Sequence, residues 1–200
     1  LRAIAEQERS GAVHAAERLR AAGFFDWATP ASRPVVSVGS TPTAHFAEKL
    51  DGVTEVRAGV FVFFDLVMAG IGVCKLDDIA LSVLTTVIGH QKEKGWTLID
   101  AGWMALSRDR GTAKQPVDQG YGVVCDLDGH PIPDLIVTET NQEHGVVAYR
   151  NGGKAPELPV GTRLRVLPNH ACATGAQHDG YNVAASGLGS PLAWRRFSGW

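Results

Sequence analysis

Charged residues, cysteines and long apolar runs are all scarce in this sequence of 200 residues. Only 20% of the residues are charged and 44% are apolar, a balance typical of a globular protein with a hydrophobic core rather than of a disordered chain. The formal net charge is -2 and no basic run occurs, so we expect neither nucleic acid nor an anionic membrane as a partner. No apolar run reaches the length of a transmembrane helix. The length allows one large domain or two small ones.

The three cysteines, Cys74, Cys125 and Cys172, cannot all form disulfides with one another. The sequence shows no secretory signal pattern, and reduced thiols are the expected state of cysteines in such a chain. We therefore expect a cytoplasmic protein. Reduced cysteines also leave Cys172 free to bind a metal ion as a thiolate.

The chain begins without a methionine. Its first residues, LRAIAEQERSGAVHAAERLRAAGFF, start inside an amphipathic pattern rather than before one. We therefore expect the intact protein to have a further N-terminal portion. Apolar residues at helical spacing predict one amphipathic helix over residues 1–25.

After this helix the sequence changes twice. A loop with two prolines precedes the short apolar strand PVVSVGS, a succession expected at the end of a parallel α/β layer. From about residue 55 short β-branched and aromatic segments, punctuated by Gly, Pro, Asp and Asn, predict an all-β domain of seven or eight strands. The predicted fold class is α/β plus all-β, with an α/β piece over residues 1–52 and a β domain over residues 53–200. The segments are VFVFFDLVMAG, ALSVLTTVIGHQ, GWTLIDAG, GYGVVCD, DLIVTETNQEHGVVAY, TRLRVLPNHACAT and YNVAAS.

The stretch VSVGSTPTA, residues 36–44, carries a first candidate site. A strand that runs into Gly39, Ser40 and Thr41 places backbone N–H groups and hydroxyls at its carboxyl end, where α/β layers bind phosphate. The same residues also suit an ordinary turn in which a Ser or Thr caps a helix. Both interpretations remain open.

The stretch LPNHACATG, residues 167–175, carries a second candidate site. On a strand, His170 and Cys172 would point to the same face and could reach one ion. Imidazole and thiolate suit zinc, and two protein ligands would leave coordination positions open for water or substrate. The alternative is a buried strand with a free cysteine and a hydrogen-bonded histidine.

Other polar residues give weaker indications. Glu143 and His144 are adjacent, so they could act as a pair in a turn but not on a strand. His178 and Asp179 resemble turn residues that could support a metal ligand. The lysines lie in polar contexts that do not lower the pKa of an amine: Lys49, Lys75, Lys92, Lys94, Lys114 and Lys154.

Six motifs in order resemble the C-terminal half of the family of D-serine dehydratases and D-threonine aldolases, pyridoxal-phosphate enzymes of fold type III. They are VGSTPTA, EVRAGVFVFFD, DAGWMALSRDRG, NQEHG, LPNHACATGAQHDGYNV and WRRFSGW, and together they cover nearly the whole chain. The resemblance implies an alanine-racemase-like architecture. Residues 1–52 would be the end of the (β/α)8 barrel that holds the cofactor, and residues 53–200 the D-serine dehydratase-like β domain.

The resemblance also implies the cofactors. Gly39, Ser40 and Thr41 would lie in the loop that binds the phosphate of pyridoxal 5'-phosphate, and His170 and Cys172 would bind Zn²⁺. Pyridoxal phosphate supplies an electron sink at the α-carbon of a D-amino acid, and zinc next to the β-hydroxyl acts as a Lewis acid. The implied reaction is the conversion of D-serine or D-3-hydroxyaspartate to a 2-oxo acid and ammonia.

Alternatives remain within this resemblance. The same site could serve a D-threonine aldolase, although family aldolases often carry an acid at the position of Cys172. Phe61 replaces a tyrosine that is common in the family, and no lysine here matches the Schiff-base lysine, so this chain alone holds no such catalytic residue. A truncated, non-catalytic remnant or metal-binding module is therefore a further alternative. The resemblance also implies a homodimer and a small D-amino acid as partners.

Overall fold

The computed structural model describes residues 35–154, 156–184 and 192–197, together with residues 10, 13–15, 17, 18 and 21. Most of the helix predicted over residues 1–25 therefore lies outside the described residues. The chain divides into two compact units, Leu1–Val62 and Phe63–Trp200. The predicted domain boundary between residues 52 and 53 stays a prediction, and each unit is described by itself. No helix among the described residues is long and apolar enough to span a bilayer.

In the first unit two short strands flank a helix. Strand β1 (Ser37–Val38) pairs in parallel with β2 (Glu55–Val56), and helix α2 (Thr41–Phe46) lies between them in the sequence. A short 3-10 turn, η2 (Val60–Val62), follows. A parallel pair needs a crossover connection, and the helix supplies it.

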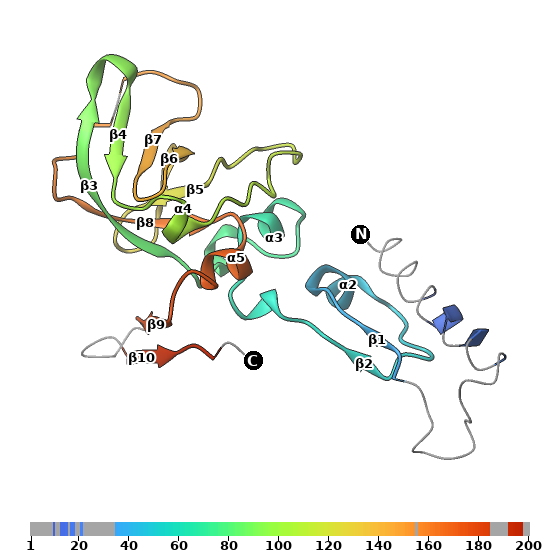
Figure 1. Cartoon of the computed structure of the whole chain (residues 1–200). Coiled ribbons are helices and arrows are strands. Elements are labelled where there is room, and N and C mark those ends of the chain that lie inside the picture. Colours follow the sequence, from blue (N-terminus) through green and yellow to red (C-terminus); the bar gives the residue numbers. More distant parts are fainter. Residues whose placement is uncertain are drawn as a thin grey trace. The chain divides into compact units, whose positions relative to one another are not determined.

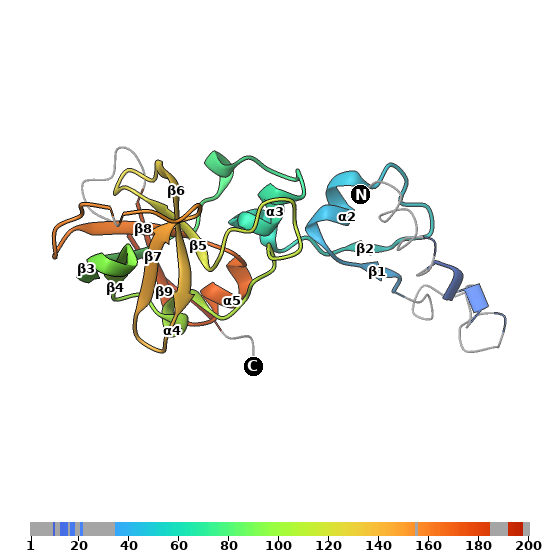
Figure 2. The same cartoon turned by 90° about the horizontal axis from the view of Figure 1, so that it is seen from above.

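The second unit contains a closed barrel of six strands, which runs in the order β3-β4-β7-β6-β5-β8 (Figures 1 and 2). Each neighbouring pair is antiparallel. The register shifts within three of these pairs, and such bulges bend strands and help a sheet to close. The strands are β3 (Val83–Gln91), β4 (Trp96–Ile99), β5 (Gly122–Cys125), β6 (Pro131–Thr140), β7 (Gly145–Tyr149) and β8 (Arg163–Pro168).

Alternating side chains from these strands fill the core. On β5, Val124 belongs to the main cluster, whereas Val123 and Cys125 point to a second cluster that includes Leu66. Strand β5 is therefore buried on both faces, and its sequence GVVC has no polar alternation because neither face meets water. The main cluster comprises Val83, Val87, Ile99, Ala101, Leu106, Val124, Leu135, Val137, Val147, Leu164 and Val166.

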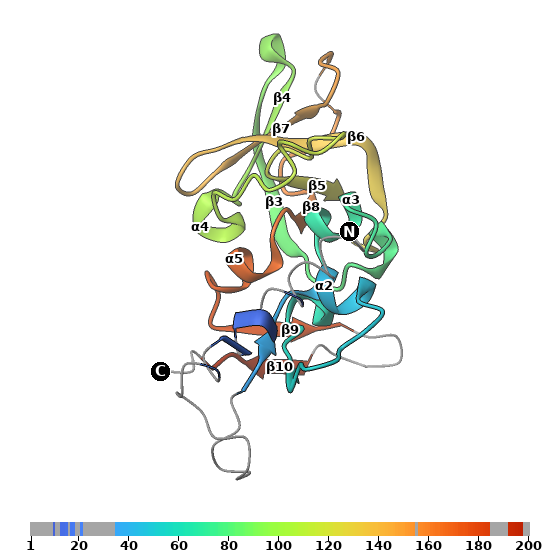
Figure 3. The same ribbon diagram turned by 90° about the vertical axis from the view of Figure 1, so that its right-hand side faces the viewer.

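Three short helices gather beside the barrel. Helix α5 (Ala171–Gly175) lies between α4 (Trp103–Leu106) and α3 (Leu66–Gly70) in Figures 1 and 3. A separate antiparallel hairpin of β9 (Gly180–Val183) and β10 (Leu192–Arg195) follows. Two further 3-10 turns are η3 (Leu76–Asp78) and η4 (Lys92–Lys94).

The predicted strand in VFVFFDLVMAG is wrong, because this segment forms η2 and then α3. Phe64 has a positive φ of 52°, which breaks an extended chain. Asp65 then caps the helix, since its Oδ1 accepts a hydrogen bond from the backbone N–H of Met68 at 2.9 Å. The local cap outweighs the β propensity of the valines and phenylalanines.

Candidate metal site at the end of strand β8

His170 and Cys172 lie just after β8, but not on a strand as their spacing suggested. Strand β8 ends at Pro168, His170 is the N-cap residue of α5, and Cys172 lies in the first turn of that helix. The backbone of His170 is extended, with φ of -139° and ψ of 109°. A junction between strand and helix, rather than strand alternation, therefore presents the two candidate ligands.

The imidazole of His170 has a carboxylate partner that the sequence did not indicate. Nδ1 of His170 lies 2.6 Å from Oδ2 of Asp109. A carboxylate accepts hydrogen bonds, so with Nδ1–H as the donor the lone pair of the imidazole lies on Nε2. Asp109 lies 61 positions earlier in the chain, in the motif SRDRG, which was noted only as part of a family resemblance.

Asp65 fixes the backbone from which these side chains project. Its Oδ2 accepts a hydrogen bond from the N–H of Ala171 at 2.8 Å, while its Oδ1 caps α3. The side chain is 1% exposed. One buried carboxylate thus satisfies backbone donors at the starts of two helices, α3 and α5.

Asn169 links the turn before α5 to the loop that carries Asp109 by two hydrogen bonds. Its Oδ1 accepts from the N–H of Thr112 at 3.0 Å, and its Nδ2 donates to the carbonyl of Gly120 at 2.7 Å. On the far side of the turn, the hydroxyl of Thr174 donates to the carbonyl of Leu106 at 2.8 Å. These buried hydrogen bonds hold the α5 turn against its neighbours, which is the preorganisation that a metal ligand requires.

The three cysteines fall into two classes. Cys125 is buried, and burial raises the pKa of its thiol to about 11. Burial, aided by the nearby carboxylates of Asp78 and Asp65, raises the pKa of the Cys74 thiol to about 11 as well. Cys172 is exposed. It is therefore the cysteine accessible to an ion from solvent, and imidazole nitrogen with thiolate sulfur is a combination of donors that suits zinc.

The residues that gave weaker indications in the sequence, Glu143, His144 and His178, each contact another residue. Nε2 of His144 lies 3.1 Å from the side-chain amide nitrogen of Asn141, and the carboxylate of Glu143 accepts from Gln142 at 3.2 Å. The turn thus pairs each of them with a neighbour and not with the other. The ring of His178 contacts the carbonyl of Ala105 at 3.0 Å, so it joins the turn after α5 to α4.

In the first unit the predicted phosphate loop begins with a helix cap. The hydroxyl of Ser40 accepts from the N–H of Thr43 at 3.2 Å, so the capping interpretation of VSVGSTPTA is confirmed. The guanidinium of Arg57 lies against Gly39, where an added Cβ would stand 2.8 Å from Cζ of Arg57. The hydroxyl of Thr41 accepts from the N–H of Phe61 at 3.2 Å. The guanidinium of Arg57 beside this loop could attract an anion such as phosphate. Phosphate binding by Gly39, Ser40 and Thr41 therefore stays a prediction.

A turn of three potential ligands lies elsewhere in the second unit. Ligand atoms of Asp126, Asp128 and His130 lie within 4.8 Å of one another. However, Asp126 Oδ1 already accepts from the N–H groups of Asp128 and His130, at 3.0 and 2.9 Å. The bond from His130 holds the pKa of the Asp126 carboxyl below its usual value. These contacts describe an Asp-stabilised turn between β5 and β6.

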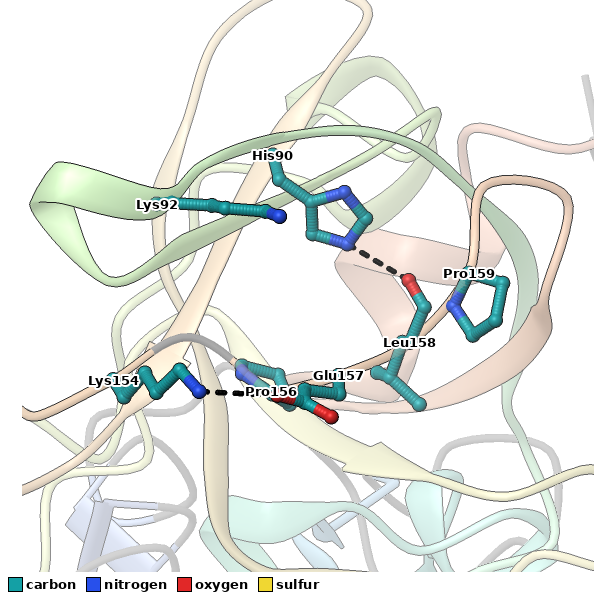
Figure 4. Close-up of a pocket in the computed structure, with 7 residues that line it drawn as sticks. All are labelled: His90, Lys92, Lys154, Pro156, Glu157, Leu158 and Pro159. Atoms are coloured by element: carbon teal, nitrogen blue, oxygen red, sulfur yellow. Dashed lines mark hydrogen bonds and ion pairs between the residues drawn. The ribbon is translucent and has the colours of Figure 1, made fainter.

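A pocket in the second unit is lined by other residues than the candidate ligands. It has a volume of about 560 Å³ and opens between the loops of the barrel, where the ring of His90 points to the carbonyl of Leu158 at 2.7 Å (Figure 4). Lys154 pairs with Glu157 at its rim. None of the residues predicted from the sequence lines this pocket.

The chain is similar to a known domain family and to characterised dehydratases. A profile of the family described as "Putative serine dehydratase domain" matches residues 80–184. The chain is 61% identical over 204 residues to a D-threo-3-hydroxyaspartate dehydratase from Delftia sp. (strain HT23), a match that covers 100% of this chain and 52% of that protein. It is 32% identical over 157 residues to a D-serine dehydratase from Dictyostelium discoideum, covering 74% of this chain and 38% of that protein.

A further relative is a D-threonine aldolase from Arthrobacter sp, which is 30% identical over 158 residues, covering 76% of this chain and 36% of that protein. The chain therefore spans about half or less of the length of these curated relatives.

Solved structures agree with the fold. The D-threo-3-hydroxyaspartate dehydratase from Delftia sp. HT23 superposes with a TM-score of 0.88 at 60% identity, covering 100% of this chain and 52% of that one. An alanine-racemase-like protein from Idiomarina loihiensis superposes with a TM-score of 0.85 at 51% identity, covering 98% of this chain and 50% of that one. The predicted fold class is thus confirmed.

Two variants of D-threo-3-hydroxyaspartate dehydratase have also been solved. One has alanine in place of a histidine, and the other, in a metal-free form, has alanine in place of a cysteine two positions later.

Proposed function

The chain belongs to the serine dehydratase domain family, and from this premise we propose that the whole protein is a lyase dependent on pyridoxal phosphate and zinc. Its substrate is a β-hydroxy D-amino acid, either D-threo-3-hydroxyaspartate or D-serine. The products are the corresponding 2-oxo acid and ammonia, since the water lost in dehydration is regained on hydrolysis. The observation that carries the proposal is the pair His170 and Cys172 with the carboxylate of Asp109 behind the imidazole.

His170 and Cys172 are the residues that would hold the zinc ion. Their spacing matches that of the histidine and cysteine replaced in the two dehydratase variants, one of which is metal-free. Gly39, Ser40 and Thr41 would bind the phosphate of the cofactor, a role supported by the guanidinium of Arg57 beside Gly39. No residue of this chain is proposed as the Schiff-base lysine.

When bound, pyridoxal phosphate supplies an electron sink at the α-carbon and zinc supplies a Lewis acid for the β-hydroxyl. The residues of this chain would hold the metal and orient its ligands. Nε2 of His170 is directed away from Asp109, and the exposed Cys172 would add a soft sulfur ligand. Buried contacts of Asp65 and Asn169 hold the backbone turn that carries both candidate ligands, which would orient them towards an ion.

D-Threonine aldolase activity is the second candidate, favoured by the D-threonine aldolase among the relatives. The two reactions give different products from D-threonine, namely glycine and acetaldehyde in the aldolase case and 2-oxobutyrate in the dehydratase case. A cytoplasmic location and a homodimer, both predicted from the sequence, belong to the same proposal.

The test is an assay of the full-length protein for 2-oxo acid release from D-threo-3-hydroxyaspartate, D-serine and D-threonine, with and without a chelator. We expect activity on the first two substrates that is lost on chelation and restored by zinc. Activity that survives complete removal of zinc would contradict the metal role, and glycine as the product from D-threonine would favour the aldolase.

Substitution of the ligands makes the test specific to this site. His170→Ala and Cys172→Ala should bring dehydratase activity below detection while the protein remains folded by circular dichroism. Asp126→Ala, which alters the exposed acidic turn, should retain the parental rate. Loss of activity in Asp126→Ala with normal activity in His170→Ala would indicate that the metal binds at the turn of Asp126, Asp128 and His130 instead.

A further inference from the structure

We propose that Asp109 is a positioning residue for His170, whose carboxylate fixes the orientation of the imidazole and directs Nε2 to the metal. The inference rests on the proposed function, because it concerns the same metal site. It assigns a role to a residue 61 positions away from the ligand in the sequence.

The contact itself is short and directional. Asp109 Oδ2 lies 2.6 Å from Nδ1 of His170, and both side chains are partly shielded, with 33% and 41% of their surfaces exposed. A carboxylate in this position accepts the Nδ1–H, which selects one tautomer and one ring orientation. It also makes Nε2 a stronger donor to a cation.

The two arginines that flank Asp109 are held by other partners. The guanidinium of Arg108 stacks over the ring of Trp103, 4.2 Å from its centroid. Arg110 donates to Asp118 at 2.5 Å. Although the motif SRDRG places two cations next to the carboxylate in the sequence, the fold gives each of them a separate neighbour. Neither contact takes up the carboxylate of Asp109, whose Oδ2 lies against Nδ1 of His170.

The backbone on the Asp109 side is also constrained. Ser107 has a positive φ of 75°, which is uncommon for a residue with a side chain, and its hydroxyl accepts from the N–H of Asp109 at 3.2 Å. The preceding carbonyl, of Leu106, accepts from the hydroxyl of Thr174 in α5. The turn that carries Asp109 and the helix that follows His170 are therefore joined, and the carboxylate and imidazole meet without a flexible segment between them.

His178 and Asp179, which the sequence suggested as the supporting pair, do not take this position. The ring of His178 contacts the carbonyl of Ala105, and the carbonyl of Asp179 accepts from the N–H of Arg196 at 3.0 Å. They fix the turn after α5 rather than the ring of His170.

The experiment measures the zinc affinity of the full-length protein by competition with a chromophoric chelator. Asp109→Asn and Asp109→Ala should bind zinc about 10- to 100-fold more weakly than the parent protein. The matched control is Lys114→Gln, which removes an exposed charge from the same loop, leaves Arg110 paired with Asp118, and should keep the affinity within about twofold. The absorption spectrum of the Co²⁺-loaded protein is the second readout, and it should change in both Asp109 variants but not in the control.

The possible results separate the two proposals. Parental zinc affinity in Asp109→Ala would overturn the positioning role. An equal loss of affinity in Lys114→Gln would overturn it too, since the effect would then belong to the loop as a whole. His170→Ala serves as the reference. If it binds zinc as tightly as the parent, the proposed metal site itself fails, whereas a loss in His170→Ala with no loss in Asp109→Ala leaves the proposed function intact.

Discussion

At the scale of single residues, exposure separates Cys172 from the other cysteines. A thiol reacts as its thiolate, and a pKa of about 11 means that Cys74 and Cys125 are almost wholly protonated at pH 8, with about one thiolate in a thousand. Cys125 is in addition 0% exposed. Chemical modification should therefore distinguish the three residues.

We predict that brief treatment of the metal-free protein with iodoacetamide at pH 8 modifies Cys172 first. Because the pKa of each of the other two thiols is raised, their modification should increase only as the pH rises towards 11. Peptide mass spectrometry measures the extent of alkylation at each cysteine. The substitution Cys172→Ser should remove the rapid phase of alkylation. Faster labelling of Cys74 than of Cys172 would show that the assigned exposure is wrong.

Residue types and motifs mark His170 and Cys172 as candidate ligands in the sequence, but they do not indicate the residues that contact the turn bearing them. Asp65 and Asp109 reach the α5 turn across 106 and 61 positions. Contacts of that length depend on the closed barrel, which no local pattern specifies. Ser40 was different, because a cap acts on the N–H only three residues later and can be recognised locally.

At the scale of helices and strands, burial on the barrel distinguishes otherwise similar side chains. Leu135 on β6 is 0% exposed and belongs to the main core, whereas Leu84 on β3 is 60% exposed. Truncation of a buried leucine loses its transfer free energy and leaves a cavity, while truncation at the surface does neither.

We predict that Leu135→Ala lowers the free energy of unfolding by about 3 kcal/mol. Leu84→Ala is the matched control and should change it by less than about 0.5 kcal/mol. Urea denaturation followed by tryptophan fluorescence measures both values. Similar losses in the two variants would contradict the assignment of inward and outward faces on β3 and β6.

Periodicity in the sequence predicted the strands better than the short helices. Six of the seven expected β segments contain a strand, since β-branched alternation is visible within a few residues. Helices α3 and α5 have five residues each, too few to show a helical stripe. Their caps and long-range hydrogen bonds form them, so HACAT and DLVMAG were expected as parts of strands.

At the scale of the whole molecule, a metal ion that binds only the folded chain should stabilise it. The proposed site draws on β8, α5 and the Asp109 loop, and these segments come together only when the barrel domain is folded. Zinc at 100 times its dissociation constant should therefore add about 2.7 kcal/mol to the free energy of unfolding.

We predict that the unfolding temperature of the full-length protein rises with zinc concentration and falls on chelation. His170→Ala should abolish this dependence without greatly altering the unfolding temperature of the metal-free protein. Differential scanning calorimetry over a series of zinc concentrations provides the measurement. A zinc-dependent increase that persists in His170→Ala would place the stabilising ion elsewhere.

The order of the strands around the barrel is the part of the fold that sequence patterns do not reveal. Alternation marks each strand, but the neighbours β5 and β8 are separated by a whole hairpin in the sequence. Their pairing follows from the common core of Val124 and Val166, a property of three-dimensional packing.

The hydrogen bond between Asp65 and Ala171 has a consequence for the order of events during synthesis. The carboxylate that starts α3 leaves the ribosome 106 residues before the backbone N–H that it will bind. Until then Asp65 can cap only the helix next to it, and the turn bearing both candidate ligands cannot take its final form. Loading with metal should therefore follow translation of this domain, and a nascent chain stalled before residue 171 should retain no zinc at this position.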